Sequence, residues 1–299
     1  MWCLFKEFRE IFNQTTNQLN QTKRKLGKTM KKIILSIFAA AMNIAASQAQ
    51  VMVFQETFDD LSNGTNLSTA NTDLTYLRIG TNGSIKATSP GFFGTGASAS
   101  ITQSASSGSL TGIGVQSTLQ SSNIYTMAFD FRPLDLAGDF VIGVGAGASF
   151  TGNSTFAGAH GLFWLQSDSG NLQRRLGTNW INVGVGTTLG LNSNNLLHII
   201  ANGSAASASY TGGSVGAGMM DIYLNGTLLD DDVAVTTALN ATGFRMYNVS
   251  KGDTAVDNIT LWTGAVAPVA SVPEPSTGAL LVLGGAALVA VRSLRKKNS

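Results

Sequence analysis

The chain is short of the side chains on which most metal and thiol sites depend. Of its 299 residues one is cysteine, Cys3, and two are histidine, His160 and His198. The sequence therefore excludes a disulfide framework, a cysteine-ligated zinc site and a thiol nucleophile in the body of the chain. Two histidines without a cysteine nearby also disfavour a transition-metal site.

Charge is scarce as well, and it is divided unevenly along the chain. Charged residues make up 12% of the sequence, about half the roughly 25% of a typical soluble domain. Residues 50–271 hold seven of the nineteen Lys and Arg but fourteen of the seventeen Asp and Glu. Because nucleic-acid binding needs clustered basic residues, this mildly acidic body excludes nucleic acid as an expected partner.

The body also lacks a window with a helical stripe of apolar residues, and its pattern is that of strands. Residues 125–132 alternate apolar and polar side chains, as a half-buried strand does. Asn225-Gly226 lies between two apolar runs and predicts a hairpin. Many short strands separated by turn residues predict an all-β sandwich or barrel, which we assign to residues 50–265. The other candidate strands are residues 140–144, 161–166, 180–185, 196–201, 219–224, 243–247 and 256–262.

A secretory signal peptide, with a short signal helix, is predicted at residues 30–49. Two lysines precede the apolar residues 33–46, and Ser47 and Ala49 occupy the −3 and −1 positions of a cleavage site. We expect export through the Sec translocon and cleavage by signal peptidase after Ala49. The alternative is an uncleaved anchor, although about 14 apolar residues are few for a membrane span. Residues 1–29 are then either a mis-assigned start of translation or a long leader region.

The other end of the chain predicts a linker and a membrane anchor. Residues 266–276 are rich in proline and small residues, which favours an extended linker. Residues 277–299 hold a short apolar run followed by four basic residues. This order predicts a single C-terminal transmembrane helix with its basic end in the cytoplasm.

The linker and anchor together resemble the PEP-CTERM protein-sorting signal, in the family's order and spacing. The resemblance implies a bacterial envelope protein, held at the membrane as a precursor until an exosortase cuts near the Pro-Glu-Pro step. It also implies a final place at the cell surface or in the exopolysaccharide matrix. An ordinary C-terminal anchor is the alternative. The matching residues are Val272, Pro273, Glu274, Pro275, Arg292 and Arg295.

Six segments follow one another in the body: residues 56–60, 125–133, 162–165, 198–202, 221–226 and 255–261. Their order resembles the concanavalin A-like jelly roll of laminin-G-like, lectin and glucanase modules. The resemblance implies a two-sheet antiparallel jelly-roll sandwich. In related folds an acidic residue near the first strand and an Asp in the last strand can share a structural calcium ion, whereas solvated strand ends are the alternative. The matching positions here, and thus the candidate calcium ligands, are Glu56, Asp59, Asp60, Asp257 and Asn258.

Catalytic residues are not predicted. Glycoside hydrolysis needs two carboxyl groups on either side of the bond that breaks. The body has one glutamate, Glu56, so the Glu-x-Asp-x-x-Glu pattern of laminarinase-like relatives is absent. The adjacent acids of residues 230–232 are expected in a solvated turn, and His198, inside an apolar strand, is expected to be a hydrogen-bonded structural residue.

Aromatic rings are the remaining candidates for ligand contact. Trp164, Trp180 and Tyr210 are candidate glycan contacts, with burial in the core as the alternative. The expected function is that of an exported, non-enzymatic surface or matrix protein with affinity for carbohydrate. A glycoside hydrolase or lyase is one alternative, and a purely structural or adhesive matrix protein is another. No cofactor is expected beyond the candidate calcium ion.

Overall fold

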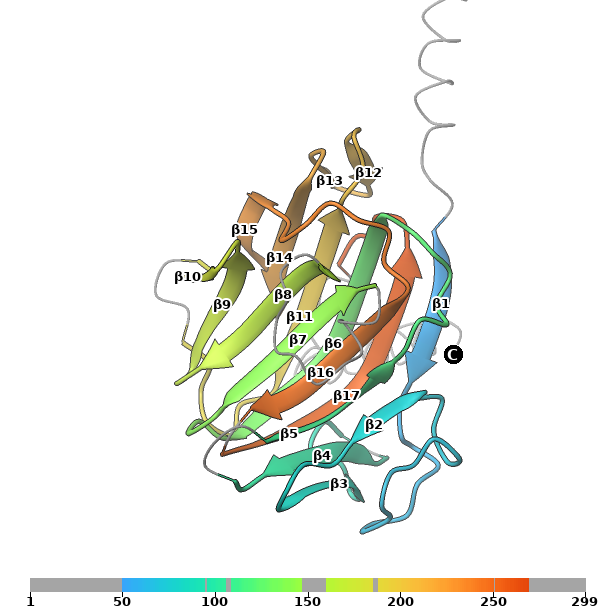
Figure 1. Cartoon of the computed structure of the whole chain (residues 1–299), viewed down its shortest axis with the longest axis vertical. Helices are drawn as coiled ribbons and strands as arrows, with labels where there is room; N and C mark the ends of the chain where they lie inside the picture. Colours follow the sequence, from blue (N-terminus) through green and yellow to red (C-terminus); the bar gives the residue numbers. More distant parts are fainter. Residues whose placement is uncertain are drawn as a thin grey trace, which may run out of the picture. The chain divides into compact units, whose positions relative to one another are not determined.

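Two large antiparallel β-sheets form the described part of the chain (Figure 1). The computed structural model describes residues 50–268 except for residues 95, 106–108, 147–159, 185–187 and 250. The named elements within these residues are all strands, which confirms the all-β sandwich class. None of the described residues forms a helix long and apolar enough to span a membrane. Residues 1–49, with the predicted signal peptide and its cleavage site after Ala49, and residues 269–299, with the predicted sorting motif and anchor, lie outside the described residues.

The first sheet has eight strands and is organised around a long strand near its centre. That strand, β17 (Gly252–Thr263), pairs along one edge with β6 (Ile124–Asp135). Its other edge is shared, because β4 (Ser98–Gln103) pairs with its first half and β1 (Val51–Glu56) with its second half. Beyond β6 come β11 (Asn195–Asn202), β14 (Met219–Leu224) and β15 (Thr227–Ala234), and beyond β4 comes β3 (Gly83–Thr88).

The second sheet has seven strands and crosses in front of the first in Figure 1. A separate two-stranded sheet joins β12 (Ala208–Tyr210) to β13 (Gly213–Val215). The spatial order of the seven-stranded sheet is β10 (Asn179–Asn182), β9 (Asn171–Leu176), β8 (Gly161–Asp168), β7 (Asp139–Gly145), β16 (Gly243–Val249), β5 (Leu110–Val115) and β2 (Tyr76–Arg78).

The hydrophobic core lies between the two large sheets. Alternate side chains of a strand point to opposite faces, and the inward ones from both sheets form one cluster, with Phe129 of β6 and Phe244 of β16 both fully buried. Aromatic rings make contacts from sheet to sheet: the ring centroids of Phe54 and Phe244 are 5.0 Å apart. Each such buried side chain contributes about 1.5–3 kcal/mol relative to its exposed state.

The hairpin predicted at Asn225-Gly226 is confirmed. Both residues have positive φ angles, 53° and 78°, and the flanking Leu224 and Thr227 are direct cross-strand partners. These are the backbone angles that a two-residue turn of matching twist requires.

The turn expected for residues 230–232 is wrong, because these residues belong to β15, whereas the expected solvation holds for Asp231 and Asp232, which are exposed. Asp230 forms an ion pair with Arg174 of the opposite sheet, with 3.4 Å between Oδ2 and Nε. Asp232 accepts a hydrogen bond from the backbone N–H of Gly216. The partners of Asp230 and Asp232 reduce the repulsion among the three adjacent acids of this strand.

Candidate functional site

The outward face of the seven-stranded sheet carries rings and arginines in one row across the strands. The β-sheet register places Tyr76 opposite Gly114, Arg245 between Gly114 and Gly143, and Trp164 opposite Gly143. The pairing of Leu165 with Arg174 sets Trp164 beside Arg175, and Arg175 is the direct partner of Trp180. We call this set the ring–arginine row: Tyr76, Arg245, Trp164, Arg175 and Trp180.

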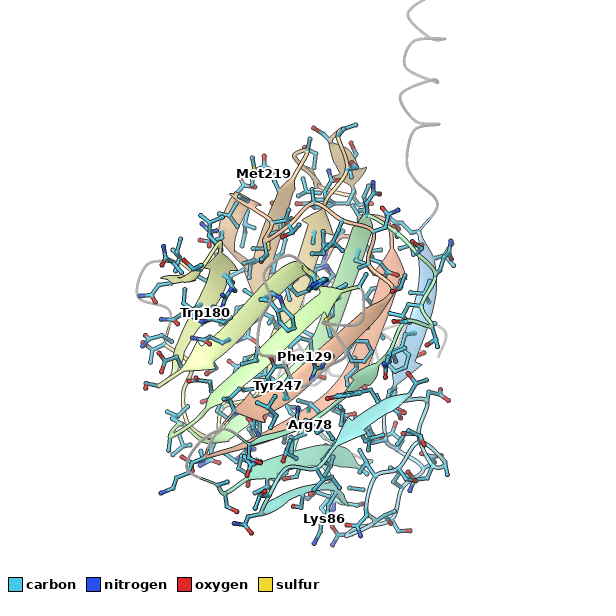
Figure 2. All side chains as sticks on the ribbon, viewed as in Figure 1. Arg78, Lys86, Phe129, Trp180, Met219 and Tyr247 are labelled. Atoms are coloured by element: carbon cyan, nitrogen blue, oxygen red, sulfur yellow. The ribbon has the colours of Figure 1, made fainter. Side chains whose placement is uncertain are left out.

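Guanidinium groups stack on rings along this row. The Cζ atom of Arg245 lies 4.7 Å from the ring centroid of Tyr76 and 5.1 Å from that of Tyr247. The Cζ atom of Arg175 lies 5.5 Å from the ring centroid of Trp180. At these separations the cation is attracted by the electron-rich face of the ring. Figure 2 labels Arg78, Tyr247 and Trp180, which lie at successive positions across the front sheet.

A second row, two residues further along the strands, consists of amide side chains. Gln166 of β8 donates from Nε2 to Oε1 of Gln173 at 2.8 Å, and Gln173 donates in turn to Oδ1 of Asn182 at 3.0 Å. The three residues are successive cross-strand partners. Each amide donates to the next, so the chain of hydrogen bonds ends at the exposed Asn182 on the edge strand β10.

In both rows, solvent reaches the residues at the β9–β10 edge of the sheet, whereas those on β8 are buried. Trp164, Tyr247 and Arg245 are each only 2% exposed, and burial raises the pKa of the Tyr247 phenol. Trp180 and Arg175, at the β9–β10 edge, are half-buried. The accessible part is therefore a small surface that we call the β9–β10 strip, formed by Gln173, Arg175, Trp180 and Asn182.

Two of the three candidate glycan contacts thus lie in the same row, although only one of them is accessible. Trp180 belongs to the β9–β10 strip, whereas Trp164, on the neighbouring strand β8, is buried with its ring over Gly143 and edge-on to Tyr247, 6.4 Å between the ring centroids. The strip itself contains no carboxylate and no histidine. It can stack against a ring and exchange hydrogen bonds, but it holds no group that could act as a general acid or base.

Tyr210, the third candidate, belongs to a different cluster, on the eight-stranded sheet. Its hydroxyl donates to Oδ2 of Asp221 at 2.7 Å and lies 2.7 Å from the hydroxyl of Tyr223. Asp221 is fully buried and also accepts a hydrogen bond from the backbone N–H of Asp232. Burial raises the pKa of the Asp221 carboxyl. These bonds attach the β12–β13 hairpin to the sheet.

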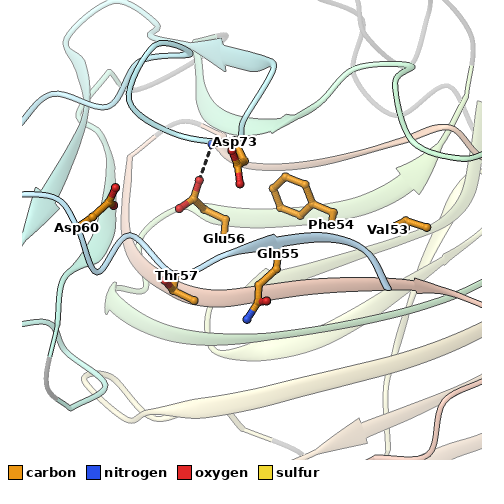
Figure 3. A pocket seen from close by; sticks show the side chains of 7 residues that line it. All are labelled: Val53, Phe54, Gln55, Glu56, Thr57, Asp60 and Asp73. Atoms are coloured by element: carbon orange, nitrogen blue, oxygen red, sulfur yellow. Dashed lines mark hydrogen bonds between the residues drawn. The ribbon is translucent and has the colours of Figure 1, made fainter. Parts of the chain in front are cut away.

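The candidate calcium ligands begin with Glu56, which lines a hollow of about 700 Å³ beside β1 (Figure 3). The Glu56 carboxylate accepts hydrogen bonds from the backbone N–H groups of Phe58, at 3.1 Å, and Asp73, at 2.8 Å. Phe58 is fully buried with a φ of 57°, so Glu56 holds a strained turn in place. Burial raises the pKa of Glu56. The residues lining the hollow are Val53, Phe54, Gln55, Glu56, Thr57, Asp60 and Asp73.

Asp257, the second main candidate, lies in a β-bulge of β17. Its Oδ1 accepts from the backbone N–H of Asn258 at 2.8 Å, and Asn258 donates from Nδ2 to Asp130 at 2.7 Å. Burial, and then the neighbouring charges of Asp59, Asp130 and Glu56, raise the pKa of Asp257 to about 7.

The five candidate ligands do not form a coordination set as they lie. Among the residues that the structure describes, no three His, Cys, Asp or Glu side chains converge closely enough to hold a metal ion. Both oxygens of Glu56 already accept backbone hydrogen bonds.

The two histidines have different surroundings. His198, on β11, is buried, and its Nε2 lies 2.9 Å from the carbonyl oxygen of Val266, which confirms the expectation of a hydrogen-bonded structural histidine. Burial lowers its pKa. His160 is half-buried just before β8, on the other sheet.

One part of the chain matches a known family. Residues 271–296 match the model of the PEP-CTERM protein-sorting motif, which confirms the resemblance at this end. The motif implies an exported precursor anchored in the cell envelope and processed by an exosortase. No curated protein matches the chain.

Several solved structures resemble the sandwich distantly. Domain 4 of AbnA, an extracellular arabinanase from Geobacillus stearothermophilus, is 15% identical, with 75% of this chain and 97% of that chain covered and a TM-score of 0.45. The endo-β-1,4-glucuronan lyase of the fungus Trichoderma reesei is 12% identical over 69% and 95% of the two chains, with a TM-score of 0.43. A Bacillus subtilis protein of unknown function with a galectin-like fold is 13% identical over 72% and 98%, with a TM-score of 0.44. These similarities leave function open.

Proposed function

We propose that this chain is an exported, non-enzymatic protein of the bacterial cell surface or extracellular matrix, and that its β9–β10 strip binds a carbohydrate polymer. The sandwich would then have the jelly-roll form that the sequence resembles. The PEP-CTERM match at residues 271–296 supports export and anchoring. The observation that carries the binding proposal is the strip itself, where the half-buried ring of Trp180 lies next to the amides of Gln173 and Asn182.

This combination suits a sugar because a sugar has two kinds of surface. Its C–H groups pack on the face of an indole ring, which offers a large and rigid apolar area. Its hydroxyls both donate and accept, as the side-chain amides do. The hydrogen bonds from Gln166 to Gln173 and from Gln173 to Asn182 hold these amides in position before any ligand arrives. A site ordered in advance loses less entropy on binding.

An enzyme that acts on polysaccharide is the second candidate, favoured by one observation. The pKa of Asp257 is raised to about 7, and a carboxyl that stays protonated near neutral pH can serve as a general acid. Asp130, its cross-strand partner, would be the second carboxylate. Release of reducing sugar from the producing cell's own matrix polysaccharide, lost in Asp257→Asn, would favour this candidate over the first.

The binding proposal is tested by retention on matrix polysaccharide. The full-length protein in detergent would be passed over immobilised exopolysaccharide from the producing cells. We expect retention by the wild type and a loss of about tenfold in affinity for Trp180→Ala, since an aromatic contact at an interface centre is commonly worth more than about 1 kcal/mol. Trp262→Ala, which removes a half-buried tryptophan of the other sheet, is the matched control. Equal retention of all three proteins would place the binding outside the strip, and no retention of the wild type would support the purely structural alternative instead.

The sorting proposal is tested by intact-mass analysis of the protein from membranes and from the medium. We expect a mature form that begins at Gln50 and ends between Pro273 and Ser276. A form that keeps Lys297 in the membrane would mean a permanent anchor, and the link to the exopolysaccharide matrix would lose its support.

A further inference from the structure

The charges of the sandwich are segregated between its two large sheets. The strands of the eight-stranded sheet contain nine acidic and two basic residues, whereas those of the seven-stranded sheet contain two acidic and four basic residues. The acids of the first sheet are Glu56, Asp130, Asp135, Asp221, Asp230, Asp231, Asp232, Asp253 and Asp257, and its bases are Lys86 and Arg132. The second sheet has Asp139 and Asp168 against Arg78, Arg174, Arg175 and Arg245.

Three of the four arginines lie on the outward face of the seven-stranded sheet. Arg78 is in register with Tyr247 through Gly112, and Arg245 and Arg175 belong to the ring–arginine row. The fourth, Arg174, pairs instead with Asp230 of the other sheet. The face that carries the β9–β10 strip therefore holds three arginines on an otherwise acidic body, and two of them, Arg78 and Arg175, are half-buried, whereas Arg245 is buried.

The acids of this sheet lie at a distance from Arg175. Asp168 is the cross-strand partner of Asn171, which is two residues before Gln173 and four before Arg175, or about 7 Å and 13 Å along a strand. Asp139 lies beyond Asp168, and burial followed by the charge of Asp168 raises its pKa.

Arg175 is held in a fixed orientation at the strip. Its Nε donates to the carbonyl oxygen of Gly177 at 3.0 Å, and its guanidinium lies over the ring of Trp180 at 5.5 Å. A planar guanidinium whose orientation is already set loses little freedom when it binds a carboxylate, and such charge-assisted hydrogen bonds are about twice as strong as neutral ones.

We propose that the polymer bound at the β9–β10 strip is an anionic polysaccharide, one whose sugars carry carboxylates, with Arg175 contacting a carboxylate and Trp180 contacting the sugar next to it. This inference rests on the proposed carbohydrate binding and adds the chemical class of the ligand. The acidic eight-stranded sheet repels the same polymer, so binding is restricted to one face. Nucleic acid, also a polyanion, fits less well, because the strip has one arginine and no lysine where phosphate binding needs a cluster of basic residues.

The experiment compares polygalacturonate with its methyl ester, which has the same backbone and no charge. Binding of the full-length protein in detergent would be measured for both polymers without added calcium, at about 0.05 M and 0.5 M salt. We expect the acid to bind at least about tenfold more tightly than the ester, and high salt to weaken the binding of the acid because screening shortens the reach of the charges.

Variants locate the interaction. Arg175→Gln should lower the affinity for polygalacturonate about tenfold, and Arg175→Lys should recover only part of it, because lysine keeps the charge but not the planar fork. Lys86→Gln, which removes an exposed cation from the other sheet, should change nothing. Circular dichroism and Tm confirm that each variant is folded.

The remaining outcomes separate this inference from the proposal on which it rests. Equal binding of acid and ester would overturn the anionic ligand and leave carbohydrate binding intact. If Arg175→Gln binds polygalacturonate as tightly as the wild type, the β9–β10 strip is not the binding site. If the protein binds double-stranded DNA more tightly than polygalacturonate, the ligand is not a polysaccharide. Failure to bind either polymer or the cell's own matrix polysaccharide would overturn both proposals.

Discussion

The imidazole Nε2 of His198 lies 2.9 Å from the carbonyl oxygen of Val266, 68 positions further along the chain. Thr126 holds the same segment from the neighbouring strand: its hydroxyl donates to the carbonyl oxygen of Gly264 and accepts from the backbone N–H of Val266. The chain therefore leaves β17 and is fastened across the outward face of the eight-stranded sheet. Pro273 follows Val266 by seven residues, so the Pro-Glu-Pro step begins within about 25 Å of Val266.

Loss of the hydrogen bond between His198 and Val266 should expose the chain ahead of the sorting motif. In His198→Ala the carbonyl of Val266 loses its donor, which costs about 1 kcal/mol. We expect a nonspecific protease to cleave residues 264–268 of the full-length protein faster in this variant, as peptide mapping would show. His160→Ala, on the other sheet, is the matched control. Cleavage at the same rate in the wild type and both variants would mean that the hydrogen bond does not restrain the tail.

The raised pKa of Asp257 makes stability depend on pH. Its folded-state pKa of about 7 lies above the roughly 3.9 of an unfolded chain. The folded state therefore binds the proton more tightly, so this group's contribution to stability is fully present below about pH 4 and is lost as pH rises to 7. The loss is about 4 kcal/mol at most. We expect Asp257→Asn to raise Tm at pH 8 and to change it little at pH 4. A wild-type Tm that rises steadily from pH 4 to pH 7, with Asp257→Asn following in parallel, would contradict this assignment.

The calcium hypothesis stays a prediction and can be tested on the same samples. A cation bound beside Asp257 would offset the charges of Glu56, Asp59 and Asp130, which raise the pKa of that carboxyl. Because an ion that binds only the folded state must stabilise it, calcium should then raise the Tm of the wild type at pH 8 and leave that of Asp257→Asn unchanged. If the wild type has the same Tm in calcium and in chelator, the calcium hypothesis is wrong, and the predicted pH dependence of Asp257 is unaffected.

The hydroxyl of Tyr210 should matter more to stability than that of Tyr223. Tyr210→Phe leaves the buried carboxylate of Asp221 without its side-chain donor, which costs about 1–3 kcal/mol. The hydrogen bond from Tyr210 favours the charged form of the Asp221 carboxyl, so its removal raises the pKa of Asp221 further. The loss of stability in Tyr210→Phe should therefore be larger at pH 8 than at pH 5. Tyr223→Phe removes only the contact between the two hydroxyls and should cost less. Denaturant unfolding of both variants at the two pH values measures the difference, and equal costs would contradict it.

The strands that could be predicted from the sequence are those with local signals. The alternation of residues 125–132 and the Asn225-Gly226 turn identified β6 and the β14–β15 hairpin. By contrast, β5 is not among the predicted strands, and its sequence Leu-Thr-Gly-Ile-Gly-Val contains two glycines, which are unfavourable in a strand. Those glycines are required by packing: a Cβ on Gly112 would lie 2.3 Å from Cβ of Tyr247, a residue 135 positions away in the sequence.

The β9–β10 strip could not have been found in the same way. Gln166, Gln173 and Asn182 have no local pattern that sets them apart from other polar residues, and only the register of β8, β9 and β10 brings them into one hydrogen-bonded row. Residue type identified two tryptophans of this face as candidate contacts but not which of them solvent reaches. Trp164 and Trp180 were candidates by residue type, but which of them is accessible depends on packing over Gly143 and beside Tyr247.

Gly143 should be needed to keep Trp164 in place beside the strip. A Cβ at this position would lie 2.2 Å from Cε3 of the Trp164 ring, so Gly143→Ala must displace the indole. We expect a loss of about 1–3 kcal/mol in stability, as overpacking of a core typically costs, together with a shift in tryptophan fluorescence and weaker polysaccharide binding through Trp180, which packs against the same cluster.

The control for this variant is another glycine-to-alanine change that has open space around it. Gly64→Ala introduces a Cβ with no atom within 4 Å, at a φ of 80°, so its cost comes from the backbone alone. It should lower stability by about 1–2 kcal/mol, the cost of a side chain in the left-handed region, while leaving fluorescence and binding unchanged. If Gly143→Ala lowers stability but binds polysaccharide like the wild type, then Trp164 serves only the packing of the sheet, and the strip depends on Trp180 and its polar neighbours without support from below.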